Sequence, residues 1–253
     1  MNRPSLHVLW MYPDVLHLHG DRGNVMALRH VAGLMGIDAE IRRVDSLQEA
    51  PDFAWADLLY FGSGELKRMP VVVSALIAQK EALDRYVAGN GMIVASGSSA
   101  AILAQWTKKT DNAKFSGLKL LDITCKQCEN VYGDDLWFEL PDGGQAIGCQ
   151  IRVIDIRLGR EQAPLGRVLY GYGNNGQDGS EGARSGNLIA CNAQGPLLVK
   201  NPRLAAAWIR DALAAHGVTD VAAPDEADFV WEDASFALIR KFIEDKMAAA
   251  GAH

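Results

Sequence analysis

A serine-containing turn is the first place where the sequence could support chemistry. The apolar segment 92–95 runs directly into Ser96-Gly97-Ser98-Ser99, and a second apolar segment follows at residues 100–103. This pattern predicts a buried strand, a sharp turn and a helix that packs back on the sheet. Hydrolase nucleophiles stand on such strand-to-helix turns, and Ser96 occupies the position where one would stand. Nucleophilic catalysis is therefore the first hypothesis to test against the rest of the chain.

The elements that must position this turn alternate between strands and helices. Strands are predicted at residues 6–11, 39–44, 56–61 and 92–95, and one long helix is predicted over residues 71–87. Asp21 or Asn24 is expected to cap a helix that continues to about residue 34. The alternation predicts an α/β fold with a doubly wound, mostly parallel sheet flanked by helices. Ligands of such sheets bind at the carboxyl ends of the strands, where Ser96 and Gly62-Ser63-Gly64 both lie.

The sequence becomes rich in short β-like segments after residue 107. Strands are predicted at residues 136–140, 146–148, 167–170 and 188–191, and a glycine- and asparagine-rich loop spans residues 171–182. Helices are predicted from residue 201 and over residues 236–247. No linker or repeat divides the chain, so we expect residues 1–253 to form a single domain with an added β-rich portion.

Charge and composition exclude several classes of protein. The chain carries a net charge of −6 over 253 residues, which argues against nucleic acid as a general partner. It contains no apolar run of 18 residues and no signal-peptide core near its start, so we expect a cytoplasmic protein without a membrane span.

Metal and cofactor sites are not predicted. Cys125 and Cys128 have the spacing of half a zinc site, but no second pair completes it, so we expect free thiols. His17 and His19 would share one face of a strand, but loop histidines are the simpler interpretation. The glycine-rich segments match neither a dinucleotide-binding nor a P-loop pattern.

Four sequence blocks together resemble the class I glutamine amidotransferase family, in its cobyric-acid-synthase-like branch. They lie in order between residues 12 and 202 and are Tyr12-Pro13-Asp14 with Gly20-Asp21-Arg22-Gly23-Asn24, the turn around Ser96, Pro164-Leu165-Gly166 with Gly173-Asn174-Asn175-Gly176-x-Asp178-Gly179-x-Glu181-Gly182, and Gly195-Pro196-Leu197-Leu198-x-Lys200-Asn201-Pro202. The resemblance implies a flavodoxin-like class I glutaminase fold. It also implies a Mur-ligase-like, ATP-using partner that forms an amide bond.

The catalytic residues of that family are replaced in this sequence. Family members carry a Cys followed by Gly-Gly at the turn and a His directly before the Gly-Pro-Leu-Leu block. Counted from Ala88-Gly89, the family nucleophile position holds Ser96, and the His position holds Gln194. Gln150 lies where the family tends to have Glu, and Asn130 lies near the position of an Arg that contacts glutamine. The resemblance further implies a pocket and oxyanion hole from Gly62, Ser63, Gly64 and Gly97, with the loop of Asn174 and Asn175 close by.

These replacements remove the chemistry of glutamine hydrolysis. That reaction needs a thiolate and a base that accepts its proton, and a glutamine side chain does not accept a proton at neutral pH. We therefore expect a catalytically degenerate subunit that supports its amide-forming partner. Two alternatives remain open. One is a serine hydrolase that uses Ser96, or Ser99 if Gly97–Ala101 is a variant of the Gly-x-Ser-Ala-Gly turn; the other is a non-catalytic amino-acid-binding sensor.

Overall fold

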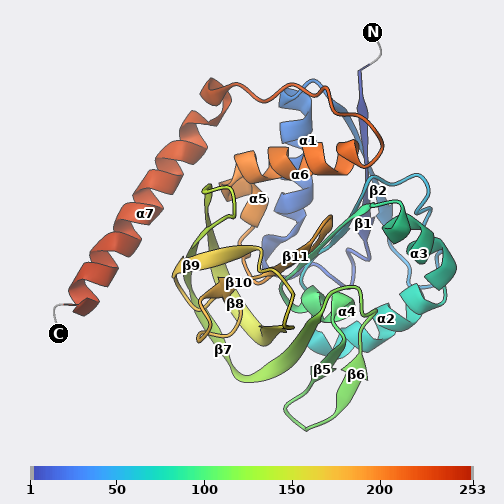
Figure 1. Cartoon of the computed structure of the whole chain (residues 1–253), viewed down its shortest axis with the longest axis horizontal. Helices are drawn as coiled ribbons and strands as arrows, with labels where there is room; N and C mark the ends of the chain where they lie inside the picture. Colours follow the sequence, from blue (N-terminus) through green and yellow to red (C-terminus); the bar gives the residue numbers. More distant parts are fainter. Residues whose placement is uncertain (1–2, 252–253) are drawn as a thin grey trace.

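A central six-stranded sheet organises the chain. The computed structural model describes residues 3–251, and Figure 1 shows their arrangement. The strand order is β11-β12-β4-β3-β1-β2, with every neighbouring pair parallel except β11 with β12. The strands are β1 (Ser5–Met11), β2 (Asp38–Val44), β3 (Leu58–Phe61), β4 (Met92–Ser96), β11 (Ala183–Ser185) and β12 (Leu188–Cys191). The predicted mostly parallel α/β sheet is confirmed.

A second sheet forms the predicted β-rich portion. Its order is β10-β9-β7-β5-β6, and β8 pairs with β7 in an antiparallel hairpin. The strands are β5 (Trp106–Lys108), β6 (Lys114–Ser116), β7 (Ile123–Glu139), β8 (Gln145–Leu158), β9 (Gly166–Tyr170) and β10 (Ser180–Glu181). The strands β7 and β8 are much longer than the predicted segments 136–140 and 146–148. The sequence pattern misses residues 123–135 of β7, whose middle is exposed, and residues 149–158 of β8, which follow the predicted segment.

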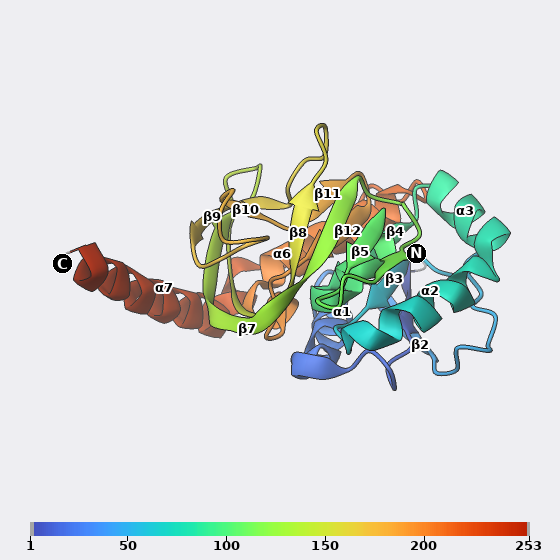
Figure 2. The ribbon, with the colours of Figure 1, turned by 90° about the horizontal axis from the view of Figure 1, so that it is seen from below.

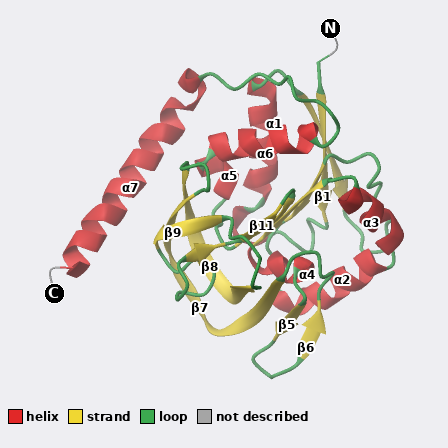
Figure 3. Cartoon of the chain, in the orientation of Figure 1, coloured by secondary structure: helices red, strands yellow, loops and turns green. Residues whose placement is uncertain are grey.

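Helices cover both faces of the central sheet (Figure 3). They are α1 (Arg22–Leu34), α2 (Met69–Ile77), α3 (Lys80–Ala88), α4 (Ala100–Leu103), α5 (Leu197–Lys200), α6 (Pro202–Ala214) and α7 (Val230–Gly251). The single helix predicted over residues 71–87 is in fact two helices, because the backbone at Gln79 is non-helical, with φ −111° and ψ 20°.

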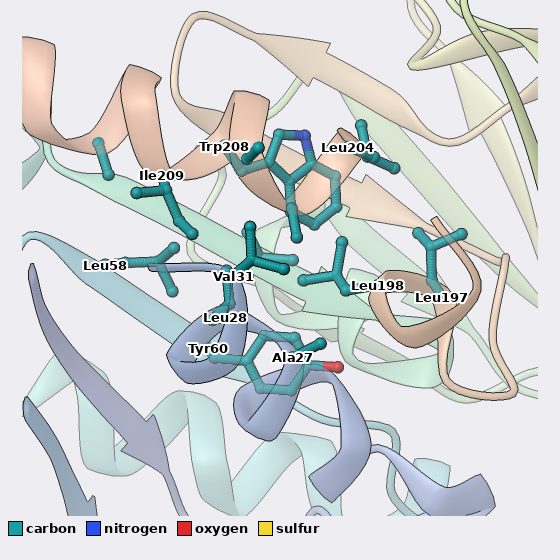
Figure 4. Packing of buried hydrophobic residues seen from close by; sticks show 14 of the residues in the cluster. Ala27, Leu28, Val31, Leu58, Tyr60, Leu197, Leu198, Leu204, Trp208 and Ile209 are labelled. Atoms are coloured by element: carbon teal, nitrogen blue, oxygen red, sulfur yellow. The ribbon is translucent and has the colours of Figure 1, made fainter. Parts of the chain in front are cut away.

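Two apolar clusters hold the layers together. One joins α1, α5 and α6 to the sheet, with Trp208 packed among Leu28, Val31 and Leu198 (Figure 4). The other packs α2, α3 and α4 against the opposite face and includes residues from β7 and β8. Because each cluster contains side chains from both sheets, the β-rich portion is fixed against the carboxyl end of β4 rather than attached loosely.

The last helix stands apart from this body. Figure 1 shows α7 at the edge of the molecule, and Figure 2 shows it extending beyond the body toward the C-terminus. It begins at Val230, six residues earlier than predicted, and continues to Gly251. No helix within residues 3–251 is long and apolar enough to cross a membrane.

Candidate functional site

The predicted strand–turn–helix unit is present at the carboxyl end of β4. The strand ends at Ser96, a 3-10 helix spans Gly97–Ser99, and α4 follows directly. Ser96 has an extended backbone, with φ −95° and ψ 137°, whereas Gly97 has a left-handed φ of +57°. A nucleophile elbow places its nucleophile on the strained residue of the turn. In this chain the left-handed residue is Gly97, one position after Ser96.

The two neighbouring positions face in different directions. The Ser96 hydroxyl donates a hydrogen bond to Asp21 Oδ1 at 3.2 Å and is buried. A Cβ atom placed on Gly97 would instead lie 2.7 Å from Gln194 Nε2 and 2.7 Å from Ser63 Oγ. A side chain at position 97 would therefore face Gln194, whereas the side chain of Ser96 faces away from it toward Asp21.

Gln194 is held in place by β8. Its backbone forms an antiparallel bridge with Cys149, with N–H to carbonyl distances of 2.9 and 3.1 Å. Its side-chain Nε2 lies 3.5 Å from the carbonyl oxygen of Ile151, and its buried Oε1 has no hydrogen-bond partner. Because the amide lies where a side chain at position 97 would need space, it fills the region in front of the turn. An amide supplies no base there.

Of the four residues expected to form an oxyanion hole, Ser63 and Gly64 are engaged in other contacts. The backbone N–H of Ser63 donates to Asp21, and that of Gly64 donates to Ser98 Oγ at 3.0 Å. The Ser98 hydroxyl in turn donates to the carbonyl oxygen of Gly64 at 2.5 Å. An oxyanion hole needs N–H groups that point at a developing charge. The N–H groups of Ser63 and Gly64 stabilise the turn instead, so they are not free for that task.

A buried polar cluster around Asp21 was missed by the sequence analysis. Asp21 precedes α1, but its side chain makes no capping hydrogen bond, so the predicted cap is wrong. Its carboxylate instead accepts hydrogen bonds from Asn24 Nδ2 at 3.1 Å, Tyr60 OH at 3.2 Å and the Ser96 hydroxyl, in addition to the Ser63 N–H. Burial raises the pKa of Asp21, and the hydrogen bonds from Ser63, Tyr60 and Ser96 oppose that shift. The cluster joins the carboxyl ends of β3 and β4 to α1.

Asn24 extends this cluster to the next element. Its side-chain oxygen accepts a hydrogen bond from the N–H of Leu198 in α5 at 2.7 Å, and its Nδ2 also donates to Tyr60 OH at 2.7 Å. It lies inside α1 rather than at its cap. The Gly-Asp-Arg-Gly-Asn block therefore ties the helix to the two strand ends and to α5. The sequence signal that could have revealed this role is a carboxylate and an amide three residues apart at the start of an otherwise apolar helix.

The contacts of the serine hydroxyls do not form a triad. Ser99 Oγ donates to the carbonyl oxygen of Gly62 at 2.5 Å, and Ser96 Oγ donates to a carboxylate. Neither hydroxyl forms a hydrogen bond with an imidazole anywhere in residues 3–251. A serine nucleophile requires an adjacent base. The geometry therefore lacks the feature on which the serine hydrolase alternative depends.

The polar residues predicted near the pocket mainly hold loops. Gln150 Oε1 accepts the N–H groups of Tyr172 and Gly173 at 2.8 and 3.0 Å, and its Nε2 donates to the Gly173 carbonyl. The side chain of Asn174 bonds to Gly182 and Ser180. Every polar atom of these two buried amides therefore has a partner within the loop 171–182 or its neighbours. They shape the wall of the site and offer no free group to a ligand.

Asn175 and Asn130 lie further from the turn. Asn175 closes its own loop, because its oxygen accepts the N–H groups of Gln177 and Asp178. Asn130 is exposed and lies where the pairing of β7 with β8 shifts register. These two residues do not converge with Gln194 and Gly97.

A buried carboxylate supports the segment that carries Gln194. Glu181 Oε1 accepts the N–H groups of Asn192 and Ala193 at 2.7 and 2.8 Å. Burial raises the pKa of Glu181 to about 7, although these N–H donors lower it in part. Glu181 thus positions the two residues that precede Gln194.

Metal ligands do not gather at the site. Across residues 3–251 no group of three or more His, Cys, Asp or Glu side chains is placed to hold a metal ion. The four cysteines are free thiols, and His17 and His19 lie in or beside a 3-10 turn at residues 18–20. The polar residues near the turn therefore form the hydrogen-bonded cluster around Asp21 and not a metal site.

The chain is similar to two curated proteins over most of its length. It is 26% identical to the GatD subunit of the glutamine-hydrolysing lipid II isoglutaminyl synthase of Streptococcus pneumoniae, over 231 residues that cover 90% of this chain and 88% of the relative. It is 27% identical to the GatD subunit of Staphylococcus aureus, over 78% of this chain and 81% of that protein. The chain is a homologue of GatD. No model of a known protein family matches it.

Solved structures agree with this kinship at the level of the fold. A crystal structure of a glutamine amidotransferase superposes with a TM-score of 0.56 at 17% identity, covering 81% of this chain and 98% of that one. A glutamine amidotransferase from Thermotoga maritima gives a TM-score of 0.50 at 11% identity, covering 84% and 94%. The GatD homologue therefore has the class I glutamine amidotransferase fold that its sequence blocks imply.

Proposed function

We propose that this GatD homologue is a catalytically degenerate amidotransferase subunit. It does not hydrolyse glutamine, and it supports a Mur-ligase-like (MurT-like), ATP-dependent partner that forms an amide bond on a cell-wall precursor. The observation that carries the proposal is the contact between Gly97 and Gln194. The left-handed position of the turn has no side chain, and the residue that faces it is an amide.

This contact also suggests a change of register at the turn. We propose that Gly97, rather than Ser96, occupies the nucleophile position of the family. Gly97 has the left-handed backbone, its missing side chain would face Gln194, and the small residues Ser98 and Ser99 then replace the Gly-Gly that follows the family Cys. Loss of a nucleophile and of its base each costs several orders of magnitude in rate, so the two losses together leave no effective hydrolysis.

Ammonia release from glutamine tests the degenerate function. The purified chain, alone and with its Mur-ligase-like partner, is incubated with glutamine, and ammonia is measured against a protein-free blank. We expect no release above the blank, and amide formation by the complex with ammonium but not with glutamine. Glutamine hydrolysis that disappears in Ser96→Ala would contradict the proposal and would establish Ser96 as a nucleophile.

The reactivity of an introduced thiol tests the register. Gly97→Cys and Ser96→Cys are each combined with Gln194→His, and the alkylation rate of the new thiol is followed against pH by mass spectrometry of its peptide. An imidazolium beside a thiol lowers its pKa below the usual value of about 8.5, whereas a buried carboxylate raises it. We expect the lower pKa at position 97 and the higher pKa at position 96, beside Asp21. The reverse order would place the nucleophile position at residue 96.

A further inference from the structure

One side of α7 is an apolar stripe without a partner within residues 3–251. Trp231, Leu238 and Phe242 are 84%, 70% and 58% exposed. They follow one another at intervals of seven and four residues, which places them on one side of the helix. Ile243, which lies about 100° around the helix from Phe242, is fully buried, so the helix is docked along a neighbouring side and leaves the stripe exposed. Figure 2 shows that α7 extends past the body, with its outer side open.

Several charged residues that flank the stripe form ion pairs. Lys241 and Asp245 lie beside the stripe and form an i,i+4 ion pair with an Nζ to Oδ2 distance of 2.9 Å. Toward the body, Lys246 pairs with Asp134 of β7 at 2.6 Å, and Asp233 pairs with Arg203 of α6. A surface whose charges are already paired gains little from a charged partner. It is complementary to an apolar surface with a polar rim.

The size of the stripe argues against a second copy of this chain as the occupant. From their exposed fractions, the three side chains present roughly 400 Å², because a large side chain buries about 150–250 Å². A stable interface needs about 800 Å² from each partner. Two bare helices in contact along these stripes fall short of this area, whereas a groove that encloses the helix from both sides can reach it.

The position of α7 connects the stripe to the candidate site. Lys246 lies over the ring of Tyr170 at 5.1 Å, and Tyr170 OH donates to Asp134 at 3.0 Å. Two residues further along the chain from Tyr170, the ring of Tyr172 lies 5.6 Å from that of Tyr132. The backbone N–H of Tyr172 donates to Gln150, which belongs to the wall of the site. A partner that encloses α7 would thus lie next to a continuous surface of β7 and β9 that leads to the turn.

We propose that the stripe formed by Trp231, Leu238 and Phe242 inserts into an apolar groove of the ligase subunit. The inference rests on the proposed function, because it assumes a ligase partner and adds the surface that binds it. The helix acts as an arm: its inner face and the Lys246–Asp134 pair fix it to the second sheet, and its outer face supplies the aromatic side chains that anchor interfaces.

The test measures binding of the full chain to the separately purified Mur-ligase-like protein of the same organism. Three forms are compared by calorimetry and by mass in solution: the natural chain, the variant Trp231→Ser/Leu238→Ser/Phe242→Ser, and the control Arg240→Gln/Glu244→Gln. The control removes an exposed ion pair of the same helix and leaves the stripe intact. We expect the stripe variant to bind at least about 100-fold more weakly, since aromatic anchors dominate such interfaces, and the control to bind as the natural chain does. Unchanged circular dichroism and melting temperature show that the stripe variant is folded.

Three other outcomes would overturn the inference. If the natural chain and the stripe variant bind the ligase equally, the arm is not the interface, although the proposed function stands. If the natural chain does not bind the ligase at all, the proposed function itself fails. If the natural chain is a dimer alone and the stripe variant is a monomer, the occupant is a second copy of the chain.

Discussion

The contact between Gly97 and Gln194 predicts a specific pattern of stabilities. Gly97→Ala adds a Cβ atom 2.7 Å from Gln194 Nε2 and from Ser63 Oγ, so both side chains must move. The substitution also places a Cβ on a left-handed residue, which costs about 1–2 kcal/mol. Overpacking of a buried site adds about 1–3 kcal/mol, and we expect the lower end because the atoms in contact are the ends of side chains. The total loss of stability is therefore about 2–3 kcal/mol.

Gly186 is a matched control for the backbone contribution. It has the same φ of +57°, and the nearest atom to an added Cβ is Asn90 Oδ1 at 3.7 Å, an ordinary contact. Gly186→Ala should therefore show the cost of the left-handed backbone without the overlap. We expect Gly97→Ala to cost about 1 kcal/mol more than Gly186→Ala.

A double-mutant cycle with Gln194→Ala isolates the contact itself. Removal of the amide relieves the overlap with Gln194 and leaves the overlap with Ser63 Oγ, so Gly97→Ala should cost about 0.5–1 kcal/mol less in the Gln194→Ala background. Urea unfolding with a constant m-value measures each corner of the cycle. The reasoning is refuted if Gly97→Ala costs no more than Gly186→Ala, or if the two substitutions are additive within about 0.3–0.5 kcal/mol.

Two further predictions concern the buried carboxylates. Asp21→Asn should destabilise the chain by about 3 kcal/mol or more, because the new NH2 group would face buried hydrogen-bond donors. Ser96→Ala should cost only about 1 kcal/mol, because it removes a single donor. Equal losses in urea unfolding would show that Asp21 is not the residue that holds this cluster together. The pKa of Glu181 is raised from 4.5 to about 7 in the folded state, so its contribution to stability is fully present below pH 4.5 and is lost as the pH rises through 7. Relative to Glu181→Gln, the natural chain should lose at most about 1.4 kcal/mol per pH unit over that range, and parallel stability–pH curves for the two forms would contradict this prediction.

The sequence predicts the inner strands β3 and β4 of the central sheet well because they are short, apolar and buried on both faces. Residues 58–61 and 92–95 are such runs, and the structure has strands there. The first half of β7 is different. It is a strand because it pairs with β5 and β8, and it continues into an exposed stretch from Glu129 to Gly133 in the middle of β7. Pairing between distant segments determines that strand, and a local pattern does not report it.

The sequence predicts where the site lies in the fold, but it does not predict which side chains contact one another there. The sequence locates the turn and pairs it with Gln194, and the structure brings these two segments together. The direction of a side chain at the turn depends on which residue adopts the left-handed backbone, and adjacent positions face opposite ways at the end of a strand. Ser96 therefore looks like the functional residue in the sequence, while its hydroxyl lies against Asp21 in the structure. The same limit applies to Asp21, whose partners Tyr60 and Ser96 are far away in sequence.

Under the proposed function, the arrangement around Gly97 accounts for a turn that persists without its chemistry. The Asp21 carboxylate holds the ends of β3 and β4 together through Tyr60, Ser63 and Ser96, so the backbone of the turn is stabilised by groups that take no part in catalysis. The amide of Gln194 fills the space that a side chain at position 97 would occupy. The sizes of the side chains at positions 97 and 194 are complementary, because a larger residue at 97 requires a smaller or displaced residue at 194. On that proposal, recovery of hydrolysis would require coordinated changes at both positions and the release of the N–H groups of Ser63 and Gly64, which favours a subunit that supports its proposed partner through its surfaces rather than through this turn.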